Sequence, residues 1–161
     1  MKSKKMTESK VNAGIRIPAP ILTLIHVTMA ILLGWLVPLP IPAPMFIKGL
    51  GFGLAAFGFV LGVLALREFR RAHTTTSDSK KPAQNLITSG VYRYTRNPIY
   101  LGFVLILIGL PLNMGIYWGF VLAWPLVTFI NNMVIKHEEA YLEKKFKEQY
   151  TDYESRVRRW L

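Results

Sequence analysis

Four long apolar runs constrain this chain more than any other feature of its sequence. They extend over residues 21–39, 45–66, 99–114 and 116–135, and Lys48 is the one charged residue that they contain. A helix of about 20 apolar residues crosses the hydrocarbon core of a bilayer, so the sequence predicts an all-α integral membrane protein with about four transmembrane helices. The third run would form a helix of about 24 Å against a core of roughly 30 Å, and whether it crosses completely stays open.

The basic residues mark one side of the predicted membrane protein. The chain has 20 Lys and Arg against 9 Asp and Glu, for a net charge of +11. Five of the basic residues precede residue 17, seven lie between Arg67 and Arg96, and seven follow from Lys136 onward. With four crossings, all of them except Lys48 lie on one side, which the positive-inside rule identifies as the cytoplasm. Both termini are therefore predicted to be cytoplasmic, and membrane topology explains the charge better than nucleic-acid binding does.

The chain is predicted to have three parts. Residues 1–16 form a basic N-terminal arm, residues 17–66 hold two transmembrane helices, and residues 67–161 hold a cytoplasmic loop, a helical hairpin and a C-terminal helix. Four glycines of the second helix form two pairs with small-xxx-small spacing, which permits close helix contact: Gly49, Gly53, Gly58 and Gly62. The sequence leaves open whether they pack within one monomer or across a homodimer.

The segment from Lys136 onward is predicted to be a cytoplasmic amphipathic helix. Three residues at four-residue intervals continue the face that carries Glu138: Leu142, Phe146 and Tyr150. Burying a carboxylate alone is costly, so Glu138 is expected to meet either a loop arginine or a ligand. Glu139 has Glu143 four residues later, and it is expected to face solvent.

Two motifs flank the predicted hairpin. Residues 86–100 read L-I-T-S-G-V-Y-R-Y-T-R-N-P-I-Y, and residues 138–142 read E-E-A-Y-L. In this order they resemble the isoprenylcysteine carboxyl methyltransferase family and its phospholipid methyltransferase relatives, which carry G-x-Y-x-x-x-R-H-P-x-Y, a hairpin and E-E-x-x-L. The resemblance covers about residues 67–161. It departs at Asn97, where the family has histidine, and at Val134, where an arginine linked to the prenylcysteine substrate would fall.

The resemblance implies an integral membrane methyltransferase that uses S-adenosyl-L-methionine and acts on a lipophilic acceptor. It places the cofactor at the cytoplasmic membrane face, between the loop, the hairpin and the C-terminal helix, without a Rossmann fold. Glu138, the first acid of its pair, is expected to accept hydrogen bonds from cofactor hydroxyls. The predicted cofactor-binding residues, to which Arg96 is added for its charge, are Gln84, Asn85, Leu86, Ile87, Tyr92, Arg96, Asn97, Pro98, Ile99, Tyr100 and Glu138.

The chemistry of methyl transfer asks little of acid and base residues. Transfer from a sulfonium is an in-line displacement, so the protein must chiefly align donor and nucleophile and exclude water; no catalytic base is assigned. Arg93 or Arg96 can hold the carboxylate of the methionine part. Aromatic faces for adenine or the sulfonium are offered by Tyr92, Tyr94 and Tyr100. A metal site is not expected, because the chain has no cysteine and no acidic residue at ligand spacing beside two histidines.

Two other function classes remain open on the sequence alone. Membrane sterol reductases share a related C-terminal element but bind NADPH in a larger domain. A scaffold or transporter subunit would explain the apolar helices but would not explain the two motifs. The acceptor is not identified either. Prenylated cysteine, an amino-headgroup phospholipid, and a small lipophilic acid or thiol all fit, although Val134 disfavours the first.

Overall fold

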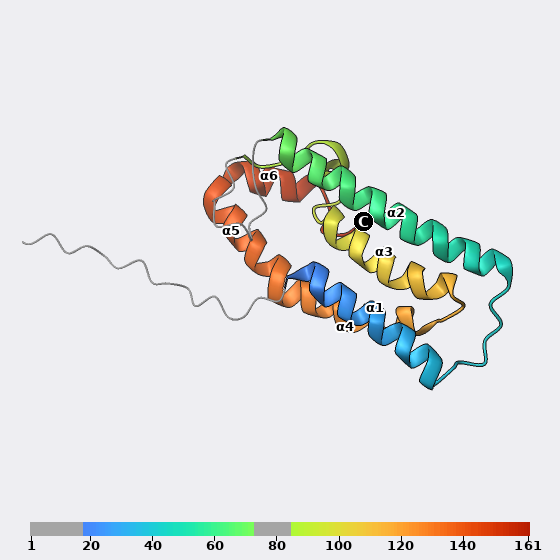
Figure 1. Cartoon of the computed structure of the whole chain (residues 1–161). Coiled ribbons are helices and arrows are strands. Elements are labelled where there is room, and N and C mark those ends of the chain that lie inside the picture. The colour runs from blue at the N-terminus through green and yellow to red at the C-terminus, as the bar shows by residue number, and fades with distance from the viewer. Residues whose placement is uncertain (1–17, 73–84) are drawn as a thin grey trace, which may run out of the picture.

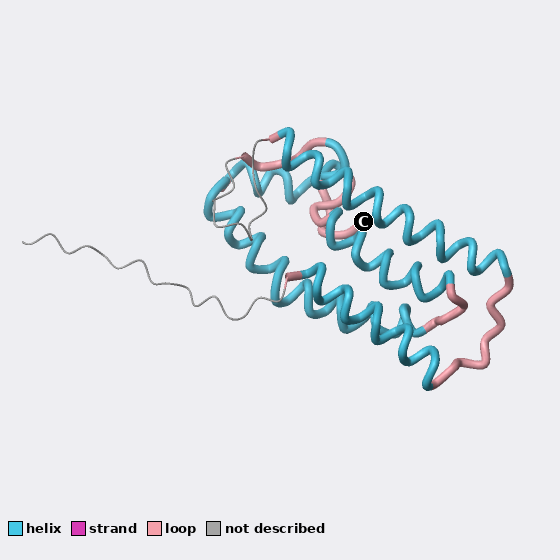
Figure 2. Tube along the Cα trace, viewed as in Figure 1, coloured by secondary structure: helices cyan, strands magenta, loops and turns pink. Residues whose placement is uncertain are grey.

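The computed structural model describes residues 18–72 and 85–161, and every regular element in these ranges is a helix. Long apolar helices form the body of the molecule, and shorter helices gather at one end of it (Figures 1 and 2). The long helices are α1 (Ala19–Leu36), α2 (Met45–Arg71), α3 (Pro98–Asn113) and α4 (Trp118–Phe129). The others are the 3₁₀-helix η1 (Gly90–Arg93), the π-helix η2 (Ile130–Ile135), α5 (Lys136–Phe146) and α6 (Glu148–Arg156).

Three helical segments are long and apolar enough to span a membrane. They are α1, α2 and the continuous segment Trp118–Phe146, which joins α4, η2 and α5. Large apolar side chains such as Phe52 and Trp124 are exposed on these segments, as lipid contact would require. α3 is also apolar but has only 16 residues, fewer than the roughly 20 that a span needs. The all-helical architecture is thus confirmed, whereas a fourth complete crossing stays a prediction.

Glycines allow α2 and α3 to lie side by side (Figure 1). A Cβ atom built on Gly58 would lie 2.6 Å from the carbonyl oxygen of Gly102, and one on Gly109 would lie 2.5 Å from the backbone nitrogen of Ala55. Such distances are too short for any side chain, so the contact depends on these glycines. An added Cβ meets nothing within 4 Å at Gly49, Gly53 and Gly62. Gly58 therefore packs inside the monomer, and a homodimer through these glycines stays a prediction.

Two apolar cores hold the helices together. The larger joins α1, α3, α4 and η2 through side chains that are fully buried: Ala30, Leu107, Leu126, Ile130 and Ile135. The smaller combines Ala65 of α2 with Ile87 and Tyr92 of the segment that precedes α3. This second core fixes that segment against the end of α2, where the candidate site lies.

The C-terminal segment differs from the single amphipathic helix that the sequence predicts. α4 continues through η2 into α5, and the helix then breaks at Lys147, whose φ is 46°. After the break α6 turns back toward the end of α2 (Figure 1). A positive φ costs a residue other than glycine about 1–3 kcal/mol. Because a lysine stands at the break, where a glycine would be expected, the sequence gives no local signal for it. The prediction of one continuous helix is wrong because contacts of α6 with the loop before α3 outweigh that cost.

Candidate active site

The loop that carries the first motif is anchored on the end of α2. Asn85 donates through Nδ2 to the carbonyl oxygen of Ala72 at 2.9 Å. Ser89 donates through Oγ to Oε2 of the buried Glu68 at 2.6 Å. Gly90 follows with a φ of +59°, and a Cβ there would lie 2.7 Å from the carboxyl carbon of Glu68, so only glycine fits this turn. Glu68, which the sequence did not single out, therefore fixes the start of the motif.

Tyr92 links α2 to α6. Its ring lies edge-on to that of Phe69, with the ring centroids 5.9 Å apart. Its backbone carbonyl accepts a hydrogen bond of 2.7 Å from the hydroxyl of Tyr153. Burial, and after it the neighbouring Tyr153, raises the pKa of Tyr92 well above the usual value for tyrosine. The Tyr92 hydroxyl is therefore neutral at physiological pH.

The two motifs meet where α3 approaches α5. Tyr100, in the first turn of α3, donates through its hydroxyl to Oε1 of Glu138 at 2.9 Å. Glu138 lies in the first turn of α5, directly after the π-helix η2. The bond from Tyr100 fixes the orientation of the Glu138 carboxylate where the two motifs meet.

Arg96 lies within a cluster of charged groups. Its Nη1 is 3.2 Å from Glu139 Oε1 and 2.5 Å from Glu154 Oε1, and it donates to the Tyr150 hydroxyl at 3.0 Å. Arg159 holds the same Glu139 through two hydrogen bonds, Nε to Oε1 at 3.0 Å and Nη2 to Oε2 at 2.6 Å. Burial lowers the pKa of Arg96, but its bond to Glu154 and the charge of Glu139 outweigh this and raise the pKa overall. The guanidinium therefore keeps its charge.

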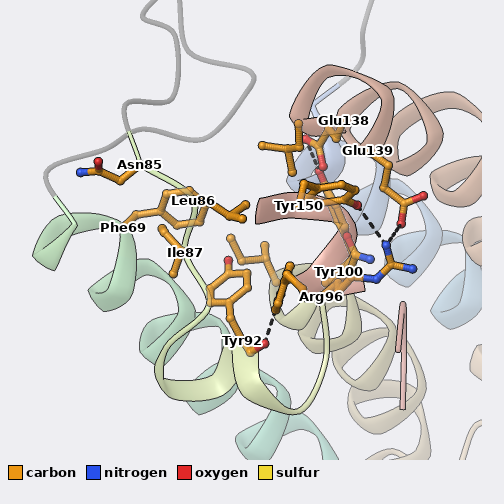
Figure 3. Close-up of a pocket in the computed structure, with 14 residues that line it drawn as sticks. Phe69, Asn85, Leu86, Ile87, Tyr92, Arg96, Tyr100, Glu138, Glu139 and Tyr150 are labelled. Atoms are coloured by element: carbon orange, nitrogen blue, oxygen red, sulfur yellow. Dashed lines mark hydrogen bonds and ion pairs between the residues drawn. The ribbon is translucent and has the colours of Figure 1, made fainter. Parts of the chain in front are cut away.

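These groups surround a pocket with a cavity volume of about 120 Å³, and the pocket is open to solvent. Its apolar side comes from α2 and the loop, its charged side comes from Arg96 and α5, and Tyr92 lies between the two (Figure 3). The lining residues are Phe69, Asn85, Leu86, Ile87, Tyr92, Arg96, Asn97, Ile99, Tyr100, Glu138, Glu139, Leu142, Tyr150 and Tyr153. The pocket thus combines an apolar surface with hydrogen-bond donors and acceptors.

Nine of the eleven predicted cofactor-binding residues line this pocket. Pro98, the first residue of α3, is fully buried and does not line it. Gln84 lies outside the described residues. Tyr94 is 75% exposed and Arg93 is exposed as well, and neither lines the pocket. Of the two arginines considered for a carboxylate, the structure brings only Arg96 to the site, and cofactor binding by these residues stays a prediction.

Five lining residues were not predicted: Phe69, Glu139, Leu142, Tyr150 and Tyr153. The expectation that Glu139 faces solvent is wrong, because its ion pairs with Arg96 and Arg159 turn it inward and leave its side chain 15% exposed. Leu142 and Tyr150 share the predicted face of Glu138, so helical spacing could have identified them. Tyr153 follows Tyr150 at three-residue spacing on the predicted amphipathic segment, whereas no sequence signal marks Phe69.

The Nε atom of Arg96 is a buried hydrogen-bond donor in a residue that lines this pocket. The Arg96 side chain is 10% exposed, and its buried Nε has no hydrogen-bond partner within the described structure. A buried donor without an acceptor costs about 1–3 kcal/mol, so Arg96 is incompletely satisfied by the described residues. In the described ranges no three His, Cys, Asp or Glu side chains gather as metal ligands would.

Comparisons with known proteins bear on the same part of the chain. The pattern that defines the phospholipid methyltransferase family matches residues 46–149, a range that includes both motifs. An uncharacterized protein of Haemophilus influenzae is 43% identical over 65 residues, which cover 39% of this chain and 100% of the relative. No solved structure matches the chain. The family resemblance read from the two motifs is thereby confirmed.

Proposed function

The chain belongs to the phospholipid methyltransferase family, and from this premise we propose that it transfers a methyl group from S-adenosyl-L-methionine to a lipophilic acceptor. The observation that carries the proposal is that Arg96 and Glu138, which come from different motifs, line one pocket beside an apolar wall. That combination suits a ligand with a carboxylate, hydroxyl groups and an aromatic ring. It supports S-adenosyl-L-methionine more than a purely apolar ligand.

Each polar group has a distinct task in this proposal. Glu138, oriented by the Tyr100 hydroxyl at 2.9 Å, accepts hydrogen bonds from the ribose hydroxyls. The charged guanidinium of Arg96, which lines the pocket, attracts the carboxylate of the methionine part. The apolar wall receives the adenine ring through Leu86, Ile87 and Ile99.

The protein has little chemistry of its own to supply. S-adenosyl-L-methionine brings an electrophilic methyl group on a sulfonium sulfur, which a nucleophile displaces in line. The chain has to align the two reactants and exclude water, and the apolar wall around Phe69 and Leu86 suits the second task. No residue is assigned as a base.

The acceptor is proposed to reach the site from the bilayer. The pocket lies at the ends of the apolar helices α2 and α3, so a lipophilic acceptor would already be concentrated beside it. Each buried methylene contributes about 0.8 kcal/mol to membrane partitioning. An amino-headgroup phospholipid or a small lipophilic acid or thiol is favoured over prenylcysteine, because Val134 stands where the substrate-linked arginine would fall.

Binding and transfer are tested separately on the purified protein in detergent. Calorimetric titration should detect S-adenosylhomocysteine and not NADPH; the opposite result would refute the methyltransferase and favour a reductase, and binding of neither would favour a scaffold. Labelled S-adenosyl-L-methionine is then offered with phosphatidylethanolamine, prenylcysteine or extracted host lipids. Label should enter the lipid fraction. Efficient methylation of prenylcysteine would overturn the acceptor inference, and transfer confined to water-soluble acceptors would overturn entry from the bilayer.

A further inference from the structure

The end of the chain lies between the two motifs that form the pocket. The backbone nitrogen of Arg96 donates to the carbonyl oxygen of Arg158 at 3.0 Å. The carbonyl oxygen of Arg159 accepts from Thr95 Oγ1 at 3.2 Å and from Asn97 Nδ2 at 3.0 Å. The main chain of the C-terminal segment is therefore bonded to three consecutive residues of the first motif.

The side chains of the same segment reach the second motif. Arg159 holds both oxygens of Glu139 at 3.0 and 2.6 Å. Trp160 donates through its indole nitrogen to Asn131 Oδ1 of η2 at 3.1 Å. Two adjacent residues thus connect the first motif to the helix that carries the acidic pair, and neither of them lines the pocket.

We propose that Arg159 is a positioning residue for the cofactor site, acting through Glu139. Its planar guanidinium holds the Glu139 carboxylate in a two-bond geometry and so fixes the rotation of the first turn of α5. Glu138 is the neighbouring residue, and the same rotation sets its distance from Tyr100. This inference rests on the proposed function, because the site that Arg159 positions is the proposed cofactor site.

Arg159 also affects the second cofactor contact. Nη1 of Arg96 is shared among Glu139, Glu154 and the Tyr150 hydroxyl. Without Arg159, Glu139 would have Arg96 as its only cation among these groups, and the guanidinium would be drawn toward it. That shift would move the Nε of Arg96 and the ring of Tyr150, so one distant arginine controls both polar ends of the pocket.

The test compares Arg159→Gln with a matched control on the same segment. Arg156 forms an ion pair with Asp152 in which both side chains are largely exposed, 68% and 65%, so Arg156→Gln removes an equal charge without touching the site. Arg159→Gln is expected to raise the dissociation constant for S-adenosylhomocysteine and the KM for S-adenosyl-L-methionine about 10-fold, as for loss of a charge-assisted contact. The kcat should change much less, and Arg156→Gln should change none of these values.

Two further variants separate positioning from a general loss of structure. Arg159→Lys keeps the charge but loses the two-bond geometry, so it should recover only part of the affinity, and it carries the comparison if Arg159→Gln does not fold. The double variant Glu139→Gln with Arg159→Gln should bind S-adenosylhomocysteine no more weakly than Glu139→Gln alone, because the effects of two substitutions that break the same contact do not add. If the two losses of affinity added fully in the double variant, or if Arg159→Gln bound S-adenosylhomocysteine as tightly as the unchanged protein, the positioning role alone would be overturned. Failure of the unchanged protein to bind S-adenosylhomocysteine would instead refute the proposed function and the positioning role together.

Discussion

Replacing Glu138 by glutamine should weaken cofactor binding while leaving the fold intact. The Tyr100 hydroxyl donates to Glu138 Oε1 at 2.9 Å, and the carbonyl oxygen of a glutamine can accept the same bond. The buried end of α3 therefore keeps its partner. What is lost is the negative charge and one of the two acceptor oxygens that the proposal assigns to the ribose hydroxyls.

The expected size of the effect follows from the kind of bond that is lost. Hydrogen bonds to charged groups contribute about 1.5–3 kcal/mol, and neutral ones about 0.5–1.5 kcal/mol. A change of about 1–3 kcal/mol corresponds to an increase of about 5- to 150-fold in the dissociation constant. The charged neighbours Arg96 and Glu139 remain in place in this variant, so the rest of the site should keep its geometry.

The assay is calorimetric titration of the detergent-solubilised protein with S-adenosylhomocysteine. Glu143→Gln is the control, because Glu143 is an exposed residue of the same helix, and its affinity should be unchanged. Glu139→Gln should have a smaller effect than Glu138→Gln, since both oxygens of Glu139 already bind Arg159. A larger loss in Glu139→Gln than in Glu138→Gln would refute the assignment of Glu138 as the cofactor anchor.

Other consequences follow for topology, packing and pH. Reporter fusions should place the C-terminus in the cytoplasm and the 37–44 connection outside, and a C-terminal reporter active only outside would contradict the predicted topology. Gly109→Ala should lower the free energy of unfolding by about 1–3 kcal/mol through overpacking, since its Cβ would lie 2.5 Å from the Ala55 nitrogen, whereas Gly53→Ala should be neutral in thermal unfolding. Burial raises the pKa of Tyr150 from 10.0 to about 12. The neutral Tyr150 hydroxyl should therefore contribute its full share of the free energy of unfolding below pH 10 and lose that share as the pH rises toward 12. The free energy of unfolding is measured across this range for the unchanged protein and for Tyr150→Phe, and equal pH dependence of the two would exclude this contribution.

The apolar runs predicted the helices well because a bilayer imposes strong local rules. α2 begins at Met45, where the second run begins, and α3 ends at Asn113, one residue before the third run ends. A span must be long, apolar and helical, so composition alone carries most of the information. The nine pocket-lining residues were identified for different reasons. The family resemblance supplied eight of them, Arg96 was added for its charge, and helical spacing supported only Glu138.

Contacts between distant residues could not be predicted in the same way. The inward orientation of Glu139 depends on Arg159, 20 residues further along the chain, and no periodic pattern connects the two. The break at Lys147 has a similar origin, because neither glycine nor proline stands there. Its positive φ is favourable only when the bonds of α6 to Arg96 and Tyr92 form. Local sequence patterns therefore do not predict the contacts by which α6 and Arg159 complete the site.

Substitutions in the contact between α2 and α3 can be distinguished from substitutions in the site, because the two sets of residues do not overlap. The contact of α2 with α3 depends on glycines such as Gly58 and Gly109, which are distant from the charged cluster in sequence and are not among the pocket residues. Changes there should reduce stability first, and binding only as the fold is lost. Changes at Arg159 or Glu138 should reduce binding in a protein whose helices remain packed. If cofactor affinity followed unfolding temperature across both groups of variants, the site would depend on overall stability and not on the ion pairs that join its two motifs.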